Sequence, residues 1–176
     1  MKKTLMILSL AASVICIGAE LPPNGSFDAP LQGGKIPHWS SSDGVLVPGF
    51  KGNAMEVTPN MARGKNLLYQ TLKCKLGKIA SGQYLLSGVC RNAFALWIVV
   101  QFDRHLGSKI PSSKIWLGKA KFRPSEKEGW MSFSAKIDVP KNAEESTLII
   151  ELLIRKDSKD NRKVALDEIK LEPIEE

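Results

Sequence analysis

The feature that most constrains the fold is a strict alternation of apolar and polar residues over several segments. Between residues 131 and 139, Met, Phe, Ala, Ile and Val occupy every second position, with Ser, Lys and Asp between them. Residues 68–76 and 84–90 carry the same pattern. Because successive side chains of a strand point to opposite faces, such a row lines one buried face of a sheet. These segments are predicted to be half-buried strands.

Two further segments, residues 95–102 and 147–154, are more continuously apolar, which is typical of central strands covered on both sides. The sequence shows no long helical period and no internal repeat. Many short strands separated by turns indicate an all-β, single-domain β-sandwich or jelly roll. Clusters of Gly, Pro, Asn and Ser mark the predicted turns, at residues 32–37, 40–44, 48–53, 58–66, 107–113 and 140–146.

Residues 1–19 are predicted to be a secretory signal peptide. Lys2 and Lys3 form a positive start, residues 5–17 are apolar, and the segment ends in small residues before Ala19. The alternative is a membrane anchor, but the apolar run is shorter than the ~20 residues that a spanning helix needs. We therefore expect cleavage near Ala19, a secreted or periplasmic location, and one mature domain of residues 20–176 without a membrane span.

The charge of the chain is positive. The net charge is +7, and removal of Lys2 and Lys3 with the signal peptide would leave +5. This excess favours an anionic partner or surface. Export argues against nucleic acid as that partner.

Three cysteines are present, and Cys16 would leave with the signal peptide. Cys74 and Cys90 remain, an even number that suits a disulfide in an oxidising compartment. The alternative is a pair of buried thiols that act as small apolar residues. A zinc site is disfavoured, because two cysteines without neighbouring His or Cys cannot fill a tetrahedral shell.

The last predicted strand contains an irregularity. Val164 and Leu166 share one parity, whereas Ile169 and Leu171 share the other. A shift of one residue turns side chains to the opposite face, so a β-bulge at residues 166–168 is the simplest explanation. Bulges often redirect a side chain, here that of Asp167.

Short motifs follow one another along most of the chain, from Asn24 to Leu171. They are found at residues 24–28, 37–39, 52–57, 68–70, 82–87, 130–140 and 166–171. Their order resembles that of the carbohydrate-binding modules of the galactose-binding-like jelly-roll superfamily. The resemblance concerns the scaffold more than the ligand, and it implies an opening strand at residues 24–28 and framework roles for Trp39 and Trp130.

The resemblance also implies a structural calcium ion where the first and last strands meet. By position, Asp28 and Asp167 are the candidate carboxylates. Carbonyls of Ser26 and of the turn at residues 49–53, which ends at Asn53, would complete the shell, since calcium takes ~6–8 oxygen ligands. The alternative is that both aspartates cap turns or pair with nearby lysines.

A sugar ring offers an apolar face and a polar rim, so its site needs an exposed aromatic ring surrounded by hydrogen-bonding groups. Of the four tryptophans, Trp97 and Trp116 have no framework role implied by the resemblance. The alternative for each candidate is packing in the core or on the surface. The candidate ligand groove consists of Arg91, Trp97, Gln101 and Trp116.

A second candidate surface is basic. Lys119, Lys121 and Arg123 occur at every second residue, so a strand would place them on one face. Such a row could bind sulfated, sialylated or uronic-acid glycans. The alternative is a solvated edge whose charges prevent pairing with another molecule.

The resemblance implies a secreted, non-catalytic carbohydrate-binding module that carries calcium and binds a glycan or polysaccharide, with an acidic glycan as one candidate. A protein-interaction or envelope-structural domain, bound to other envelope proteins, is the main alternative. An enzyme of unrecognised type is the second. Catalysis has little support, because His38 and His105 are the only histidines and neither lies in a nucleophile or metal signature.

Overall fold

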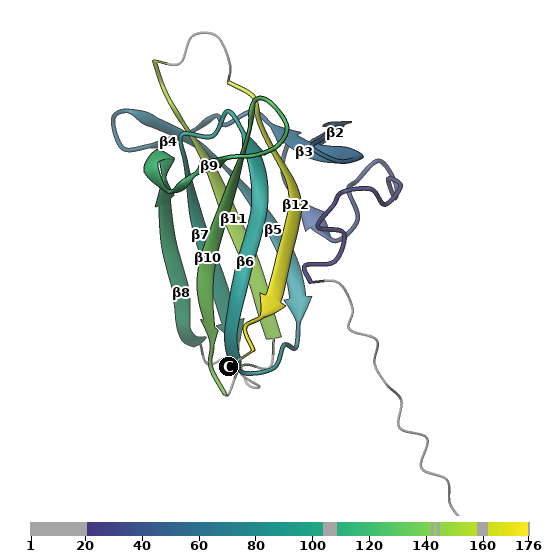
Figure 1. The fold of residues 1–176 in the computed structure, drawn as a ribbon, viewed down its shortest axis with the longest axis vertical. Coiled ribbons are helices and arrows are strands. Elements are labelled where there is room, and N and C mark those ends of the chain that lie inside the picture. Colours follow the sequence, from purple (N-terminus) through teal and green to yellow (C-terminus); the bar gives the residue numbers. More distant parts are fainter. Residues whose placement is uncertain (1–20, 104–108, 142, 144, 158–161, 176) are drawn as a thin grey trace, which may run out of the picture.

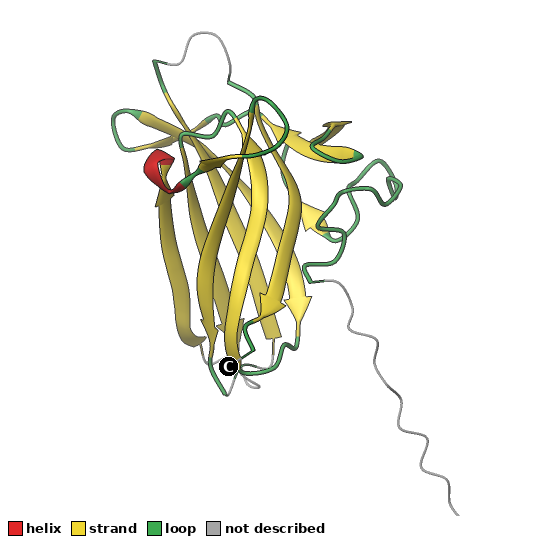
Figure 2. Cartoon of the chain, viewed as in Figure 1, coloured by secondary structure: helices red, strands yellow, loops and turns green. Residues whose placement is uncertain are grey.

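The computed structural model describes residues 21–103, 109–141, 143, 145–157 and 162–175. The predicted signal peptide therefore lies outside the described residues. Two sheets of six strands lie face to face (Figure 1), and the strands account for nearly all regular structure (Figure 2). The predicted all-β jelly-roll sandwich is confirmed. No helix in the described ranges is long or apolar enough to cross a membrane.

The first sheet is called the β11 sheet, after its central strand. Its neighbours run in the order β1-β5-β11-β7-β8, and β4 pairs with β5 beside β1. All pairings are antiparallel. Its strands are β1 (Trp39–Ser40), β4 (Met61–Arg63), β5 (Leu67–Gly77), β7 (Ala95–Asp103), β8 (Lys109–Gly118) and β11 (Glu145–Arg155).

The second sheet is called the β6 sheet. Its order is β2-β3-β12-β6-β10-β9, again antiparallel. A single 3-10 turn, η1 (Lys119–Lys121), follows β8. Its strands are β2 (Val45–Pro48), β3 (Asn53–Val57), β6 (Gly82–Arg91), β9 (Arg123–Pro124), β10 (Trp130–Val139) and β12 (Val164–Pro173).

The core lies between the two sheets and is built from the alternating rows. Leu72 and Cys74 on β5 meet Phe133 and Ile137 on β10 in one buried cluster. Trp39 is buried in the same cluster, and Trp130 is buried beneath the β2–β3 turn. The framework roles predicted for both tryptophans are confirmed.

The predicted β-bulge on β12 is also present. The pairing of β12 with β6 shifts between Asp167 and Lys170, and Glu168 takes a φ of 51°. Asp167 consequently points to the outer side of the β6 sheet, under the β2–β3 turn, where a Cβ added at Gly49 would come within 2.6 Å of its carboxylate.

The predicted opening strand at residues 24–28 is wrong. This segment forms turns, with φ values of 54° at Asn24 and 57° at Phe27, which a strand does not tolerate. The segment still lies along the last strand. The backbone N–H of Ile169 donates to the Gly25 carbonyl at 3.0 Å, and that of Leu171 donates to the Leu21 carbonyl at 2.6 Å.

Cys74 and Cys90 lie in opposite sheets and are free, buried thiols, so the second of the two cysteine alternatives holds. Burial raises the pKa of both thiols to about 12. Because the thiolate is the reactive form, we expect neither thiol to react with Ellman's reagent at pH 8 while the domain is folded. Two thiols should react once the protein is denatured without reductant. Absence of reaction in the denatured sample would contradict the assignment.

Candidate functional site

The outer face of the β11 sheet carries a pair of tryptophans. Trp97 on β7 lies directly opposite Trp116 on β8, and their ring centroids are 5.8 Å apart in an edge-to-face arrangement. Trp116 is 42% exposed, and Trp97 is half-buried. The two rings form an aromatic surface that is open to solvent, the kind of surface on which a sugar ring can stack.

An arginine from the short edge strand β4 covers the middle of this face. The guanidinium of Arg63 lies 4.9 Å from the Trp97 ring centroid and 5.9 Å from that of Tyr69. It also forms an ion pair with Glu151, which lies opposite Trp97 on β11. The guanidinium thereby neutralises the carboxylate and leaves its other N–H groups for a ligand.

We call the surface formed by Arg63, Tyr69, Trp97, Trp116 and Glu151 the aromatic half of the face. Sequence analysis did not select Arg63, Tyr69 or Glu151. Strand parity predicts that Tyr69 points away from the core, but only the order of the strands puts Tyr69 and Glu151 on the face of Trp97. Arg63 follows from no local signal, because its contact with Glu151 joins residues 88 positions apart.

Farther along the same strands the face becomes basic. Gln101 on β7 is exposed and lies opposite Thr147 on β11, which lies opposite Lys75 on β5. Lys73 and Lys114 are exposed in the intervening row. Three of the four predicted groove residues, Trp97, Gln101 and Trp116, therefore share one face.

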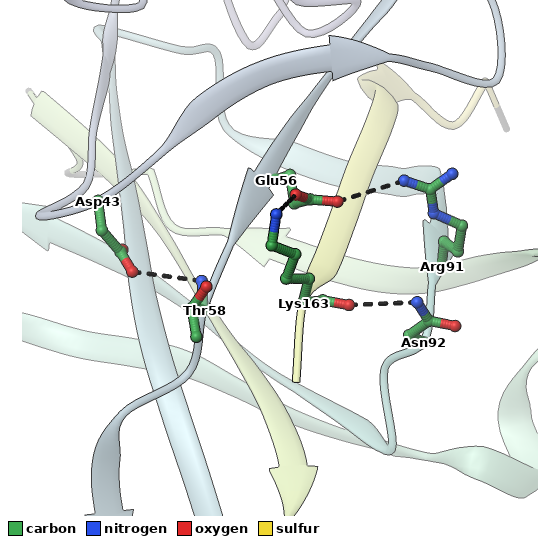
Figure 3. A network of polar contacts seen from close by, with 6 residues as sticks. All are labelled: Asp43, Glu56, Thr58, Arg91, Asn92 and Lys163. Carbon is green, nitrogen blue, oxygen red and sulfur yellow. Dashed lines mark hydrogen bonds and ion pairs between the residues drawn. The ribbon is translucent and has the colours of Figure 1, made fainter. Parts of the chain in front are cut away.

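The fourth predicted groove residue, Arg91, is not with them. It lies on β6, in the other sheet, where its guanidinium stands 5.1 Å from the Trp130 ring centroid. It also pairs with Glu56 at 3.4 Å, and Lys163 pairs with the same carboxylate at 3.1 Å (Figure 3). Arg91 thus belongs to a structural ion-pair network, and the predicted four-residue groove does not form.

The predicted basic row is also wrong as a strand face. Lys119 and Lys121 belong to the 3-10 turn η1, and Arg123 begins β9. The guanidinium of Arg123 donates to the carbonyls of Ala120 and Phe122 at 3.0 and 3.2 Å. The chain turns here because it passes from β8, at the edge of the β11 sheet, to β9, at the edge of the β6 sheet. The three basic side chains therefore do not alternate along one strand.

Both aspartates predicted to bind calcium accept hydrogen bonds from the β2–β3 turn. Asp167, fully buried, accepts hydrogen bonds at one carboxylate oxygen from the backbone N–H groups of Phe50 (2.8 Å) and Lys51 (3.1 Å), and at the other from that of Glu168 (2.7 Å). Burial raises the pKa of Asp167 to about 6, and these three bonds oppose the rise. Asp28 accepts from the Asn53 N–H at 2.8 Å. The two aspartates therefore hold the backbone of the turn at different residues, Asp167 at Phe50 and Lys51 and Asp28 at Asn53.

The groups at this turn are of the type that calcium prefers, because two carboxylates and several backbone carbonyls are all hard oxygen ligands. Within the described part of the chain no three acidic, His or Cys side chains cluster as a metal site, so carbonyls would have to supply most ligands. Asp28 and Asp167, with carbonyls of Ser26 and Asn53, would hold the ion. The ammonium of Lys127 donates to the carbonyls of Gly49 and Phe50, which leaves these two less available.

We propose that a calcium ion binds at this turn, and its effect on stability tests the proposal directly. A bound ion at a hundredfold excess over Kd would stabilise the folded domain by about 2.7 kcal/mol, or roughly 5–10 °C in Tm for a domain of this size. Differential scanning fluorimetry in millimolar calcium and in EGTA would measure this. Asp28→Asn should abolish the difference, and equal wild-type melting temperatures in both buffers would refute the proposal.

Comparisons with known proteins place the fold. No family model matches the chain, and no curated protein sequence matches it. Among solved structures, the enzymatically active domain of bacteriophage CBA120 tailspike protein 4 matches with a TM-score of 0.57 at 12% identity, over 88% of this chain. This chain spans only 21% of that structure's length.

Two carbohydrate-binding modules match over nearly their whole length. TmCBM61, solved in complex with β-1,4-galactotriose, has a TM-score of 0.53 at 11% identity and covers 89% of this chain and 100% of its own. The CBM22-1 xylan-binding domain of Paenibacillus barcinonensis Xyn10C has a TM-score of 0.54 at 11% identity, with coverages of 86% and 93%. The chain thus has the jelly-roll β-sandwich fold of carbohydrate-binding modules.

Proposed function

We propose that this domain is a secreted, non-catalytic module that binds a glycan on the outer face of the β11 sheet. The observation that carries the proposal is the solvent-accessible pair of Trp97 and Trp116, with the guanidinium of Arg63 over Trp97 and the amide of Gln101 farther along the same face. Aromatic rings suit the apolar face of a sugar, and the polar groups suit its hydroxyls. The structural neighbours that bind galactotriose and xylan lend support through fold alone.

Two carboxylates of this face, Glu151 and Glu145, do not form a glycosidase pair. Glycosidases place two carboxyl groups ~5–9.5 Å apart across the scissile bond. Glu151 is paired with Arg63, and Glu145 lies six residues away on β11, roughly 20 Å along an extended strand. That separation is too large for the two to act on one glycosidic bond.

We further propose that the glycan is acidic. The chain has a net charge of +7, and Lys73, Lys75 and Lys114 are exposed on the same face as the tryptophans. The row at Lys119, Lys121 and Arg123, which first suggested this ligand class, is dispersed by the fold. The lysines on the outer face of the β11 sheet support an acidic ligand instead.

The test is a glycan array that covers neutral and acidic oligosaccharides, followed by fluorescence titration of the hits. Stacking on Trp97 or Trp116 should quench or shift tryptophan emission, whereas Trp39 and Trp130 are buried and should not respond. No binding to any glycan of the array would refute the proposal and favour a protein-interaction or envelope-structural domain on the same scaffold.

A further inference from the structure

A groove of about 480 Å³ opens at the edge of the β11 sheet, next to the basic part of its outer face. Its floor is apolar and includes Ile36 and Trp39. Its rim is polar and basic. The rim residues are Lys35, His38, Ser40, Lys73, Lys75 and Thr147.

The three lysines reach this groove from two directions. Lys73 and Lys75 lie on β5 and point to the same face as Thr71. Thr71 lies opposite Glu151 on β11, which lies opposite Trp97 on β7, so the two lysines share the outer face with Trp97. Lys35 comes from a tight turn in which Gln32 and Lys35 exchange backbone hydrogen bonds of 2.9 and 3.0 Å. Positive φ values at the two glycines between them permit this turn. The position of the Lys35 backbone is therefore fixed beside the sheet.

No described residue neutralises these ammonium groups. None of the three forms an ion pair with a side chain in the described ranges, and no carboxylate lines the groove. The nearest acids have other roles or positions. Glu151 is held by Arg63, Asp43 accepts from the Thr58 N–H at 3.2 Å, and the exposed Glu145 lies beyond Thr147 at the end of β11. Three like charges around one groove favour an anion.

The groove and the aromatic half form one continuous surface. Lys73 lies two strands across the sheet from Trp97 and two residues farther along its strand than Thr71, which is level with Trp97. With strands ~4.8 Å apart and ~3.4 Å per residue along a strand, their backbones are roughly 12 Å apart. A monosaccharide stacked on Trp97 would not reach Lys73, but a short oligosaccharide would.

We propose that Lys35, Lys73 and Lys75 form an anion subsite for a carboxylate or sulfate group of an oligosaccharide whose other sugars stack on Trp97 and Trp116. The inference rests on the proposed function and specifies where the acidic group binds. The apolar floor at Ile36 and Trp39 would contact the sugar ring, and the ammonium groups would contact its charged substituent. A neutral glycan would fill only the aromatic half.

The experiment compares matched pairs of probes by isothermal titration calorimetry on the whole domain. The pairs are oligogalacturonate with its methyl ester, and a heparin-derived hexasaccharide with its desulfated form. The first pair tests a carboxylate and the second a sulfate. The variants are Lys73→Ala/Lys75→Ala and, as a control of equal charge change, Lys121→Ala/Lys136→Ala, in η1 and on the opposite sheet.

We expect the acidic member of at least one pair to bind more tightly than its neutral form, and this preference to decline as salt rises from 0.1 to 1 M, because the Debye length falls from ~10 to ~3 Å. The Lys73/Lys75 variant should lose about tenfold in affinity for the acidic probe, as expected for two exposed charge contacts. The control should bind like wild type.

Three results would overturn the inference in different ways. Equal affinity of each acidic probe and its neutral form, with binding still lost in Trp97→Ala, would refute the anion subsite and leave the proposed function intact. Equal losses in both lysine variants would show that net charge rather than this groove attracts the acidic probe. If neither pair bound and the glycan array were also empty, the proposed function would fail together with the inference.

Discussion

Replacement of Asp167 by Ala is expected to lower the free energy of unfolding by about 3 kcal/mol at pH 7. The substitution removes a fully buried carboxylate that accepts hydrogen bonds from the backbone N–H groups of Phe50, Lys51 and Glu168. A buried donor left without a partner costs about 1–3 kcal/mol, and part of that cost would be offset because a buried carboxylate no longer has to be desolvated. Urea unfolding in EGTA would measure the loss without any contribution from calcium.

Asp138→Ala is the matched control for this substitution. Asp138 lies on β10, where its carboxylate accepts from Gln83 at 3.1 Å on an exposed surface. We expect the control to change the free energy of unfolding by no more than about 0.5 kcal/mol, as is usual for surface substitutions. If Asp167→Ala lowered the free energy of unfolding no more than the control does, Asp167 would not stabilise the β2–β3 turn.

The raised pKa of Asp167 predicts how its contribution depends on pH. The pKa is 3.8 for an unperturbed aspartate and about 6 in the folded state, so between these values the folded state binds the proton more strongly. The contribution of Asp167 is therefore largest below pH 4 and falls as pH rises through 6, by about 3 kcal/mol. Relative to Asp167→Asn, which cannot ionise, the wild type should lose stability from pH 4 to pH 7. A pH-independent difference would contradict this prediction.

Replacement of Trp97 by Ala is expected to weaken glycan binding by about thirtyfold, equivalent to about 2 kcal/mol, which is typical of a central aromatic contact. The Trp97 indole contacts the Arg63 guanidinium and the Trp116 ring. Its loss therefore removes the stacking surface and a packing contact that holds each of these two side chains. Calorimetry with a glycan identified by the array would measure the affinity, and circular dichroism would verify the fold.

The matched control is Phe50→Ala. Phe50 is a partly buried aromatic residue in the β2–β3 turn of the other sheet, and its ring packs edge-on against Trp130 at a centroid distance of 6.2 Å. It tests whether loss of any aromatic contact weakens binding through destabilisation. We expect its affinity to equal that of wild type. If Phe50→Ala lost as much affinity as Trp97→Ala, or Trp97→Ala lost none, the ligand would not lie on the β11 sheet.

The sequence by itself determined the strands that carry a clear alternating pattern and which of their side chains are buried. The alternating rows at residues 68–76 and 131–139 line the core as expected, and the parity change at residues 166–168 is a bulge that turns Asp167 outward. These features are local, because the two-residue period of a strand records directly which face meets the core.

Only the tertiary structure decided which outward faces lie together. Arg91 and Trp97 were predicted to share a groove, but strand parity carries no information about the sheet to which each strand belongs, and the two residues are on opposite sides of the sandwich. Likewise, Arg63 reaches Trp97 and Glu151 only because β4 pairs with β5 and β5 with β11. Strand order is set by long-range pairing, and no short window of sequence contains it.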